Sequence, residues 1–221
     1  GGGFTKQTFN LSDTSYAFNS TRNQTRGRST STLRFGADYQ LTQNQSLTGT
    51  FLYRPSDGNN RVEIDYDDFN ENDVLTERQS RIDDENEKKR TLEGDIHYEK
   101  TLEGKDHKWT MDLRVQDSDD REDSEIQQIN SFGSANEYQR VNNQEDEQSF
   151  LFQTDYIKPF SKIRGIELGA RYNFRNIINN YQVSQLNESG VYENLDLYTN
   201  NFNYVENIAA AYAIYNDGIG D

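Results

Sequence analysis

The chain has 221 residues, a formal net charge of −15 and a mean hydropathy of −1.07. It contains no cysteine, which excludes disulfides and thiolate metal sites, and its acidity disfavours a nucleic-acid partner because phosphate binding needs clustered Lys and Arg. The 14 tyrosines and 12 phenylalanines argue against the disorder that charge and hydropathy alone would indicate.

Alternation of apolar and polar residues begins in residues 33–41. The apolar positions there are Leu33, Phe35, Ala37, Tyr39 and Leu41. A polar turn follows at residues 42–45, and alternation resumes over residues 47–53. Period-two patterning on both sides of a short polar turn predicts an antiparallel hairpin.

The same arrangement recurs along the rest of the chain. Short turns are predicted at residues 103–106 and 161–162, each between two alternating segments. The alternating segments are residues 92–98, 109–115, 150–156, 166–174 and 202–214. Between the hairpins we predict long polar loops, acidic in the first two cases, at residues 55–89, 117–147 and 176–200.

Short turns and long loops therefore alternate along the chain. In an antiparallel up-and-down sheet, successive connections lie at opposite ends, so all short turns share one end and all long loops the other. Outer-membrane barrels have this asymmetry, and their strands present only every second residue to lipid, which keeps mean hydropathy low. The sequence thus predicts an all-β fold, an antiparallel up-and-down transmembrane β-barrel segment of about seven to eight strands. Half-buried strands of a soluble sheet are the alternative. Rings near the predicted strand ends match the aromatic girdles of barrels: Tyr39, Tyr53, Tyr98, Trp109, Tyr156 and Phe160.

The alternation also assigns a face to each side chain. Leu168 and Ile208 are expected to face lipid, and their neighbours Glu167 and Asn207 the barrel interior. In the last segment the predicted lipid-facing residues are Phe202, Tyr204, Ile208, Ala210, Tyr212 and Ile214. The candidate lumen-facing side chains are Glu93, Asp95, Asp112, Arg114, Asp155, Glu167 and Arg171.

Metal binding has little support in the sequence. His97 lies on the polar face of a predicted strand and is expected to form a lumenal hydrogen bond, whereas His107 lies in a turn and is expected to be solvated. Neither has a partner at metal-ligand spacing. Carboxylates crowd two of the predicted loops, and such oxygen-rich clusters fit Ca²⁺, although solvated loop charges are the main expectation. These acids are Asp65, Asp67, Asp68, Asp117, Asp119, Asp120, Glu122 and Asp123.

Catalytic signatures are missing from the sequence. It contains no Gly-x-Ser-x-Gly elbow, and no glycine-rich loop that follows a strand and could cradle a phosphate. We therefore predict a protein that is not an enzyme, with no catalytic residues, no cofactor and no metal site.

Several stretches resemble a known family, the outer membrane β-barrel family of TonB-dependent receptor-like proteins from Bacteroidota. The resemblance runs from about residue 28 to the end, outside the acidic stretches. The stretches that carry it are residues 36–41 (GADYQL), 51–54 (FLYR), 153–160 (QTDYIKPF), 167–171 (ELGAR) and 202–212 (FNYVENIAAAY).

The resemblance implies a location and a function. It places the chain in the cell outer membrane, with residues 1–221 as a piece from inside a barrel of about 22 strands. The implied partners are outer-membrane lipid, a plug domain and a TonB-type periplasmic protein. The implied function is import of a large ligand, such as an iron chelate or an oligosaccharide. The alternative is a non-transporting β-sheet or small-barrel surface protein that acts in adhesion or binding.

Overall fold

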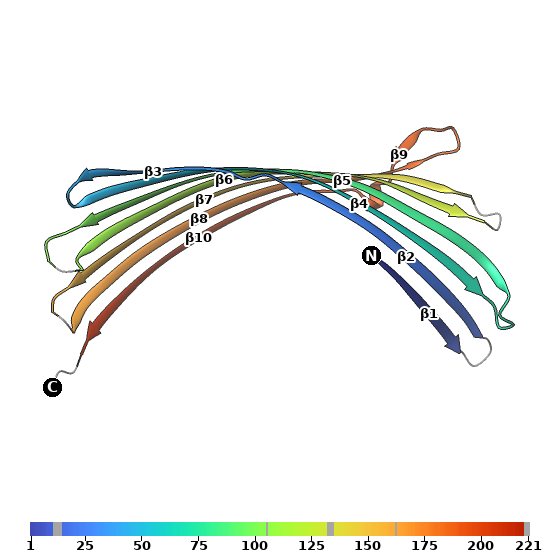
Figure 1. Cartoon of the computed structure of the whole chain (residues 1–221), viewed down its shortest axis with the longest axis horizontal. Helices are drawn as coiled ribbons and strands as arrows, with labels where there is room; N and C mark the ends of the chain where they lie inside the picture. Colours follow the sequence, from blue (N-terminus) through green and yellow to red (C-terminus); the bar gives the residue numbers. More distant parts are fainter. Residues whose placement is uncertain (11–14, 105, 132–134, 162, 219–221) are drawn as a thin grey trace.

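Ten antiparallel strands account for most of the chain. The computed structural model describes all residues except 11–14, 105, 132–134, 162 and 219–221, and the described residues form one sheet that arches as a single layer (Figure 1). The strands are β1 (Gly2–Asn10), β2 (Ser15–Thr30), β3 (Leu33–Thr42), β4 (Gln45–Phe69), β5 (Leu75–Thr101), β6 (Lys108–Asn130), β7 (Glu137–Pro159), β8 (Arg164–Leu186), β9 (Tyr192–Asn194) and β10 (Asn200–Asp217).

Neighbours in the chain are mostly neighbours in the sheet. The order is β1-β2-β4-β5-β6-β7-β8-β10, with β3 beside β4 and β9 beside β8. The one described helix is the 3₁₀ turn η1 (Asp196–Tyr198). No helix in the described part of the chain is long and apolar enough to span a membrane. The all-β, antiparallel prediction is confirmed.

Strands β2 and β3 continue one another along the same neighbour. β2 pairs with the second half of β4 and β3 with the first half, and residues 31–32 interrupt them. The interruption lies opposite Pro55, whose carbonyl still accepts a hydrogen bond from the Ser31 N–H at 3.1 Å. Because proline has no N–H, the reciprocal bond of this pair cannot form, and the ladder breaks there.

The long acidic loops predicted at residues 55–89 and 117–147 are wrong. Both stretches continue the strands on either side, so β4 and β5 reach 25 and 27 residues and β6 and β7 reach 23 each. Residues 176–186 likewise belong to β8, and the connection that remains to β10 holds β9 and η1. A strand of about 9–11 residues suffices to cross a bilayer, so these strands extend well beyond one crossing.

Turn chemistry explains why an acidic stretch folds back as a hairpin. In residues 70–74 (NENDV) the Asn70 carboxamide oxygen accepts hydrogen bonds from the N–H groups of Asn72 and Val74, at 2.9 and 3.1 Å. Residues 187–191 (NESGV) repeat this arrangement with Asn187. The fourth residue has a positive φ in both turns, 57° at Asp73 and 77° at Gly190. Asparagine at the first position and Asp or Gly at the fourth favour this turn.

The register separates an apolar face from a charged face near the short turns. On each strand the apolar face begins at the short turn and ends where the residues of the same face become polar. On β4 the last large apolar residue of this face is Tyr53, just before Pro55, and on β7 the first is Phe150, just after Gln148. At that level one nearly straight row crosses the sheet: Tyr53, Leu92, Gly94, Val115, Phe150 and Phe174. We call the part of the sheet between this row and the short turns the belt, and the part on the other side of the row the extension.

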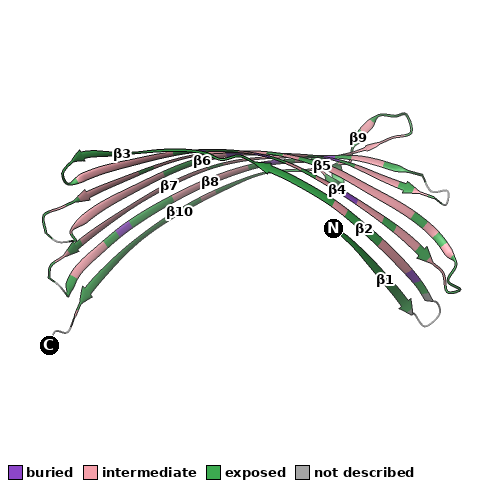
Figure 2. Cartoon of the chain, in the orientation of Figure 1, coloured by how far each residue is buried: buried purple, intermediate pink, exposed green. Residues whose placement is uncertain are grey.

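Seven strands cross the belt: β3, β4, β5, β6, β7, β8 and β10. This agrees with the predicted strand number, whereas β1 and β2 lie in the extension and were not predicted. Among the described residues no second layer covers the belt, and its apolar side chains stay open, with Phe35 59% and Val115 48% exposed (Figure 2). Such a face is stable only against an apolar medium or partner.

The predicted face of the last strand is wrong. β10 pairs with β8 so that Ala209, Ala211 and Ala213 lie opposite Tyr172, Ala170 and Leu168. Ile208 and Tyr212 instead lie opposite Asn173 and Gly169, on the charged face. Both alternating sets of β10 are largely apolar, so hydrophobic periodicity alone cannot fix its register.

Candidate functional site: the charged face of the sheet

The seven predicted lumen-facing residues come from four neighbouring strands. Glu93 and Asp95 are on β5, Asp112 and Arg114 on β6, Asp155 on β7, and Glu167 and Arg171 on β8. Their register partners follow one another across the sheet, so all seven side chains lie on one face, opposite the apolar belt.

Directly paired side chains join β4, β5 and β6 on this face. The Arg114 guanidinium donates to an Asp95 carboxylate oxygen at 2.5 Å, and the Thr50 hydroxyl donates to the other oxygen at 3.2 Å. One residue pair closer to the turn, His97 Nδ1 lies 2.6 Å from an Asp112 oxygen. The predicted hydrogen-bonding role of His97 is therefore confirmed, with Asp112 as its partner.

A second group spans β7, β8 and β10. The Tyr212 hydroxyl donates to Asp155 at 2.8 Å, and its ring crosses β8 above Gly169. A Cβ atom at Gly169 would lie 2.0 Å from Tyr212 Cε1 and 2.5 Å from Asp155 Oδ1. A glycine is therefore required on β8 for the tyrosine of β10 to reach the carboxylate of β7.

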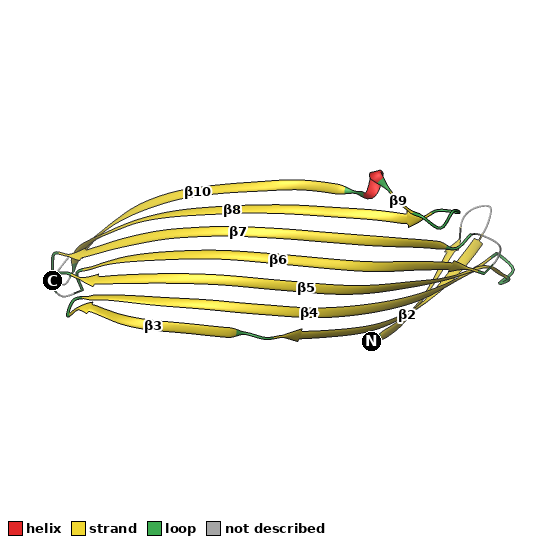
Figure 3. Cartoon of the chain, turned by 90° about the horizontal axis from the view of Figure 1, so that it is seen from above, coloured by secondary structure: helices red, strands yellow, loops and turns green. Residues whose placement is uncertain are grey.

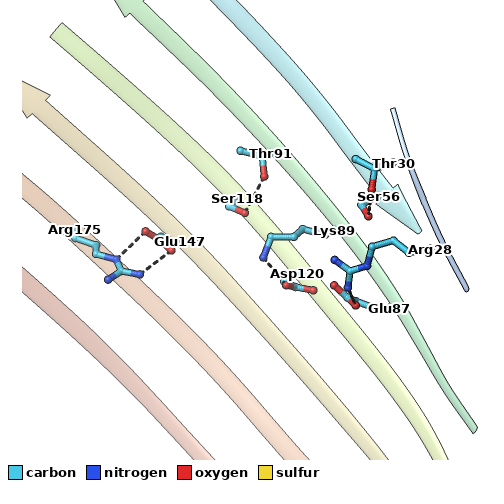
Figure 4. A network of polar contacts seen from close by, with 10 residues as sticks. All are labelled: Arg28, Thr30, Ser56, Glu87, Lys89, Thr91, Ser118, Asp120, Glu147 and Arg175. Atoms are coloured by element: carbon cyan, nitrogen blue, oxygen red, sulfur yellow. Dashed lines mark hydrogen bonds and ion pairs between the residues drawn. The ribbon is translucent and has the colours of Figure 1, made fainter. Parts of the chain in front are cut away.

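Ion pairs continue on the same face just beyond the belt (Figure 4). Two guanidinium nitrogens of Arg175 donate to the Glu147 carboxylate, at 2.8 and 3.0 Å, and the Lys89 ammonium donates to Asp120 at 2.7 Å. Two hydroxyl pairs and one further ion pair complete this row from β2 to β8: Thr30 with Ser56, Thr91 with Ser118, and Arg28 with Glu87. The charged face is thus continuous from the belt into the extension.

The belt itself has rings at both of its edges. Near the short turns Tyr98 and Trp109 meet edge-on at 6.0 Å, and Tyr156 lies opposite Trp109. At the other edge Phe150 and Tyr172 pack at 6.3 Å. An apolar band between two rows of rings is the surface that transmembrane barrels present to lipid.

Comparison with known families agrees with this geometry. Residues 100–221, more than half of the chain, match the outer membrane protein beta-barrel family. The chain belongs to this family. A search of curated proteins gave no match. The protein is therefore an outer-membrane barrel protein, and its belt is the part of the barrel wall that crosses the membrane.

His107 lies at the end of the barrel wall that carries the short turns. The sequence predicted a solvated side chain, but in the structure both ring nitrogens have partners. Its Nε2 lies 2.9 Å from the Tyr156 hydroxyl and its Nδ1 lies 2.9 Å from the Glu103 carbonyl oxygen. The ring also packs edge-on against Tyr156 at 5.5 Å. His107 thus anchors a girdle tyrosine to the β5–β6 turn.

The acids considered for Ca²⁺ do not converge. Because they lie on strands, alternate residues point to opposite faces, so Asp119 faces away from Asp120 and Glu122. The described residues contain no group of three or more His, Asp or Glu side chains that could hold a metal ion. These acids are close in the sequence but not in space, because successive side chains of a strand point to opposite faces.

Like charges nevertheless meet across the extension of the barrel wall. Glu122 lies opposite Glu87, and burial together with Glu85 and Glu87 raises the pKa of Glu122 above its usual 4.5. Asp146 lies opposite Asp119, and burial together with this carboxyl raises the pKa of Asp146 above 3.8. These pairs oppose folding when both members are ionised.

Mild acid should therefore stabilise the extension. A carboxyl whose pKa is raised in the folded state does not lower the free energy of unfolding at pH values below its ordinary pKa. Its destabilising effect develops as the pH rises through the ordinary pKa and is complete above the raised one. Relief of each like-charged pair is worth about 0.2–1 kcal/mol. We expect amide exchange in residues 117–147, corrected for intrinsic rates, to slow from about pH 7.5 to about pH 5.

The matched variant for this measurement is Glu122→Gln combined with Asp146→Asn, which removes one carboxyl from each pair and keeps the ion pair of Asp119 with Arg121. In this variant the exchange rates of these amides should depend less on pH, and the amides should be protected at neutral pH. An extension equally protected at both pH values in the unmodified protein would contradict the prediction.

Proposed function

We propose that the protein forms part of the wall of a TonB-dependent outer-membrane receptor that imports a large ligand, such as an iron chelate or an oligosaccharide, without catalysing a reaction. In this proposal the apolar belt contacts lipid, the charged face lines the lumen, and the short turns lie in the periplasm. The extension then rises outside the cell, as expected for barrels with short periplasmic turns.

The width of the arch is the observation that carries the proposal. Seven strands cross the belt, yet its edge strands β3 and β10 lie at opposite sides of the sheet (Figure 3). In an eight-stranded barrel seven consecutive strands would almost close the circle, since barrel diameter grows with strand number. An arch this open fits a wide barrel, which has room for a plug and a large ligand.

The charged face supports the same function. It carries paired charges that stiffen the wall, such as Asp95 with Arg114. Within the described part of the chain, Glu93 and Arg171 take part in none of the ion pairs. Both point into the proposed lumen, where they are suited to bind a polar plug or a passing ligand.

Binding of the energising partner tests the proposal. The whole protein, folded in detergent or nanodiscs, should bind the purified periplasmic domain of a TonB-type protein from the same cell. A control barrel of eight strands should not bind.

Strand number provides an independent measurement. Imaging of the whole barrel should show about 22 strands with a filled lumen. A closed barrel of eight to ten strands that does not bind the periplasmic domain would overturn the proposal. It would favour a small surface barrel that acts in adhesion.

A further inference from the structure

A polar pocket lies in the extension, on the same sheet face as the lipid-contacting belt. Its volume is about 490 Å³, within the range of small-ligand sites. Strands β6, β7, β8 and β10 supply its floor, and Asn194 of β9 and Thr199 supply part of its rim. Because it opens on the outer face, it lies away from the proposed transport path through the lumen.

Two rows of register partners build the floor. One row runs Arg121, Gln144, Asn180 and Asn201, each opposite the next. The adjacent row runs Asp123, Asn142 and Gln182, and Gln182 donates to Asn194 at 2.7 Å. Four strands therefore hold these groups at fixed spacing, unlike side chains on a loop.

The chemistry of the lining favours an uncharged, hydroxyl-rich ligand. Most lining groups are carboxamides, which offer both N–H donors and a carbonyl acceptor and so match sugar hydroxyls in either role. The lining has two charged groups, Arg121 and Asp123, and their charges are opposite, so the lining has no net charge. In a chain of net charge −15, such a neutral lining is unsuited to a metal ion and to a polyanion.

The height of the pocket indicates where the ligand comes from. Gln144 lies six residues beyond Phe150 and Asn180 six residues beyond Phe174, at the edge of the belt. At about 3.3 Å per residue this is roughly 20 Å along the strands, and somewhat less above the membrane because the strands tilt. With the extension outside the cell, as in the proposed function, an outward-facing group at that height lies in the saccharide layer of the outer leaflet.

We propose that this pocket binds the uncharged hexoses in the oligosaccharide of an outer-leaflet glycolipid. The glycolipid would contact the wall twice, with acyl chains on the belt and sugar in the pocket. The inference rests on the orientation given under the proposed function, with the extension outside the cell. It does not depend on transport.

The test uses the whole protein in phospholipid nanodiscs and, as probe, the uncharged hexose oligosaccharide of the outer core of lipopolysaccharide, with binding measured by calorimetry. Asn180→Ala combined with Asn201→Ala should weaken binding about tenfold, because two side chains from the central row are lost. The matched control, Gln139→Ala with Gln185→Ala, removes a directly paired amide couple from the opposite face and should leave the affinity unchanged.

Two further arms identify the source and the orientation. Nanodiscs that contain the intact glycolipid should compete with the free oligosaccharide, whereas soluble neutral glycans of other composition should compete poorly. Glu71→Cys, in the exposed β4–β5 turn at the far end of the extension and outside the pocket, should react with an impermeant maleimide on intact cells. Labelling without oligosaccharide binding, or binding unaffected by the double variant, would overturn the pocket proposal alone. Absence of labelling would overturn the orientation on which both proposals depend.

Discussion

Ala211→Arg should block membrane insertion of the barrel, whereas Ala210→Arg should be nearly silent. Residues 209–211 are consecutive alanines with identical side chains. Ala211 pairs with Ala170 and Ala209 with Tyr172 on the belt, while Ala210 pairs with Arg171 on the charged face. An arginine facing lipid near the midplane costs about 2–4 kcal/mol, and one in a water-filled lumen costs little.

Insertion efficiency into vesicles and the free energy of unfolding in lipid are the measurements. Arg171 lies beside the introduced charge in Ala210→Arg, so Ala210→Glu serves as the second control and should fold at least as well. The outcome that would contradict the structure is equal sensitivity at positions 210 and 211, because a one-residue slip of β10 would exchange the two faces.

The same register reverses the expectation from hydrophobicity at Ile208. The sequence marks Ile208 as lipid-facing, and a charge there as disruptive as one at Leu168. In the structure Leu168 lies on the belt, opposite Ala213, and Ile208 lies opposite Asn173. Leu168→Arg should therefore fail to insert and Ile208→Arg should insert, although both replace a large apolar side chain.

Much of the belt was predictable from the sequence, because one face meets lipid and the other does not. That environment imposes strict alternation, as in residues 33–41, and short polar turns mark the strand ends. The same alternation placed Glu93, Arg114 and Glu167 together on one face before any pairing was known. Periodicity was sufficient wherever the two faces differ in polarity.

The extension was missed because polar residues occupy most positions on both of its faces. Three signals in residues 55–89 could have revealed it. Val62, Ile64 and Tyr66 alternate with charged residues, and residues 70–74 have the composition of a turn. Read outward from that turn, opposite charges also mirror one another: Asp57 with Lys88, Arg61 with Asp84, and Asp67 with Arg78. Such mirrored charges support a hairpin that hydropathy does not detect.

Contacts between distant strands could not be predicted, and Gly169 shows why. Nothing in the local sequence relates it to Asp155 and Tyr212, which come from the strands on either side. Their meeting depends on the register of two strand pairs at once. The β10 register, in turn, is the feature that apolar periodicity left undetermined.

Gly169→Ala should destabilise the barrel wall by about 1–3 kcal/mol, the usual cost of overpacking a tight site. The new methyl group would overlap the Tyr212 ring, at 2.0 Å from Cε1, and force it away from Asp155. Gly49→Ala is the matched control, since a Cβ there meets no atom within 4 Å among the described residues. It should be neutral or slightly stabilising, because alanine loses less backbone entropy than glycine in a strand.

A double-mutant cycle separates the steric effect from the hydrogen bond. Tyr212→Phe keeps the ring and removes the 2.8 Å bond to Asp155, for about 0.5–1.5 kcal/mol in urea unfolding. Tyr212→Ala removes the ring, and in that background Gly169→Ala should cost much less, because the overlap is gone. If Gly169→Ala were equally costly with and without the ring, the strain would lie in the β8 backbone. The tyrosine of β10 would then not cross this strand as the structure shows.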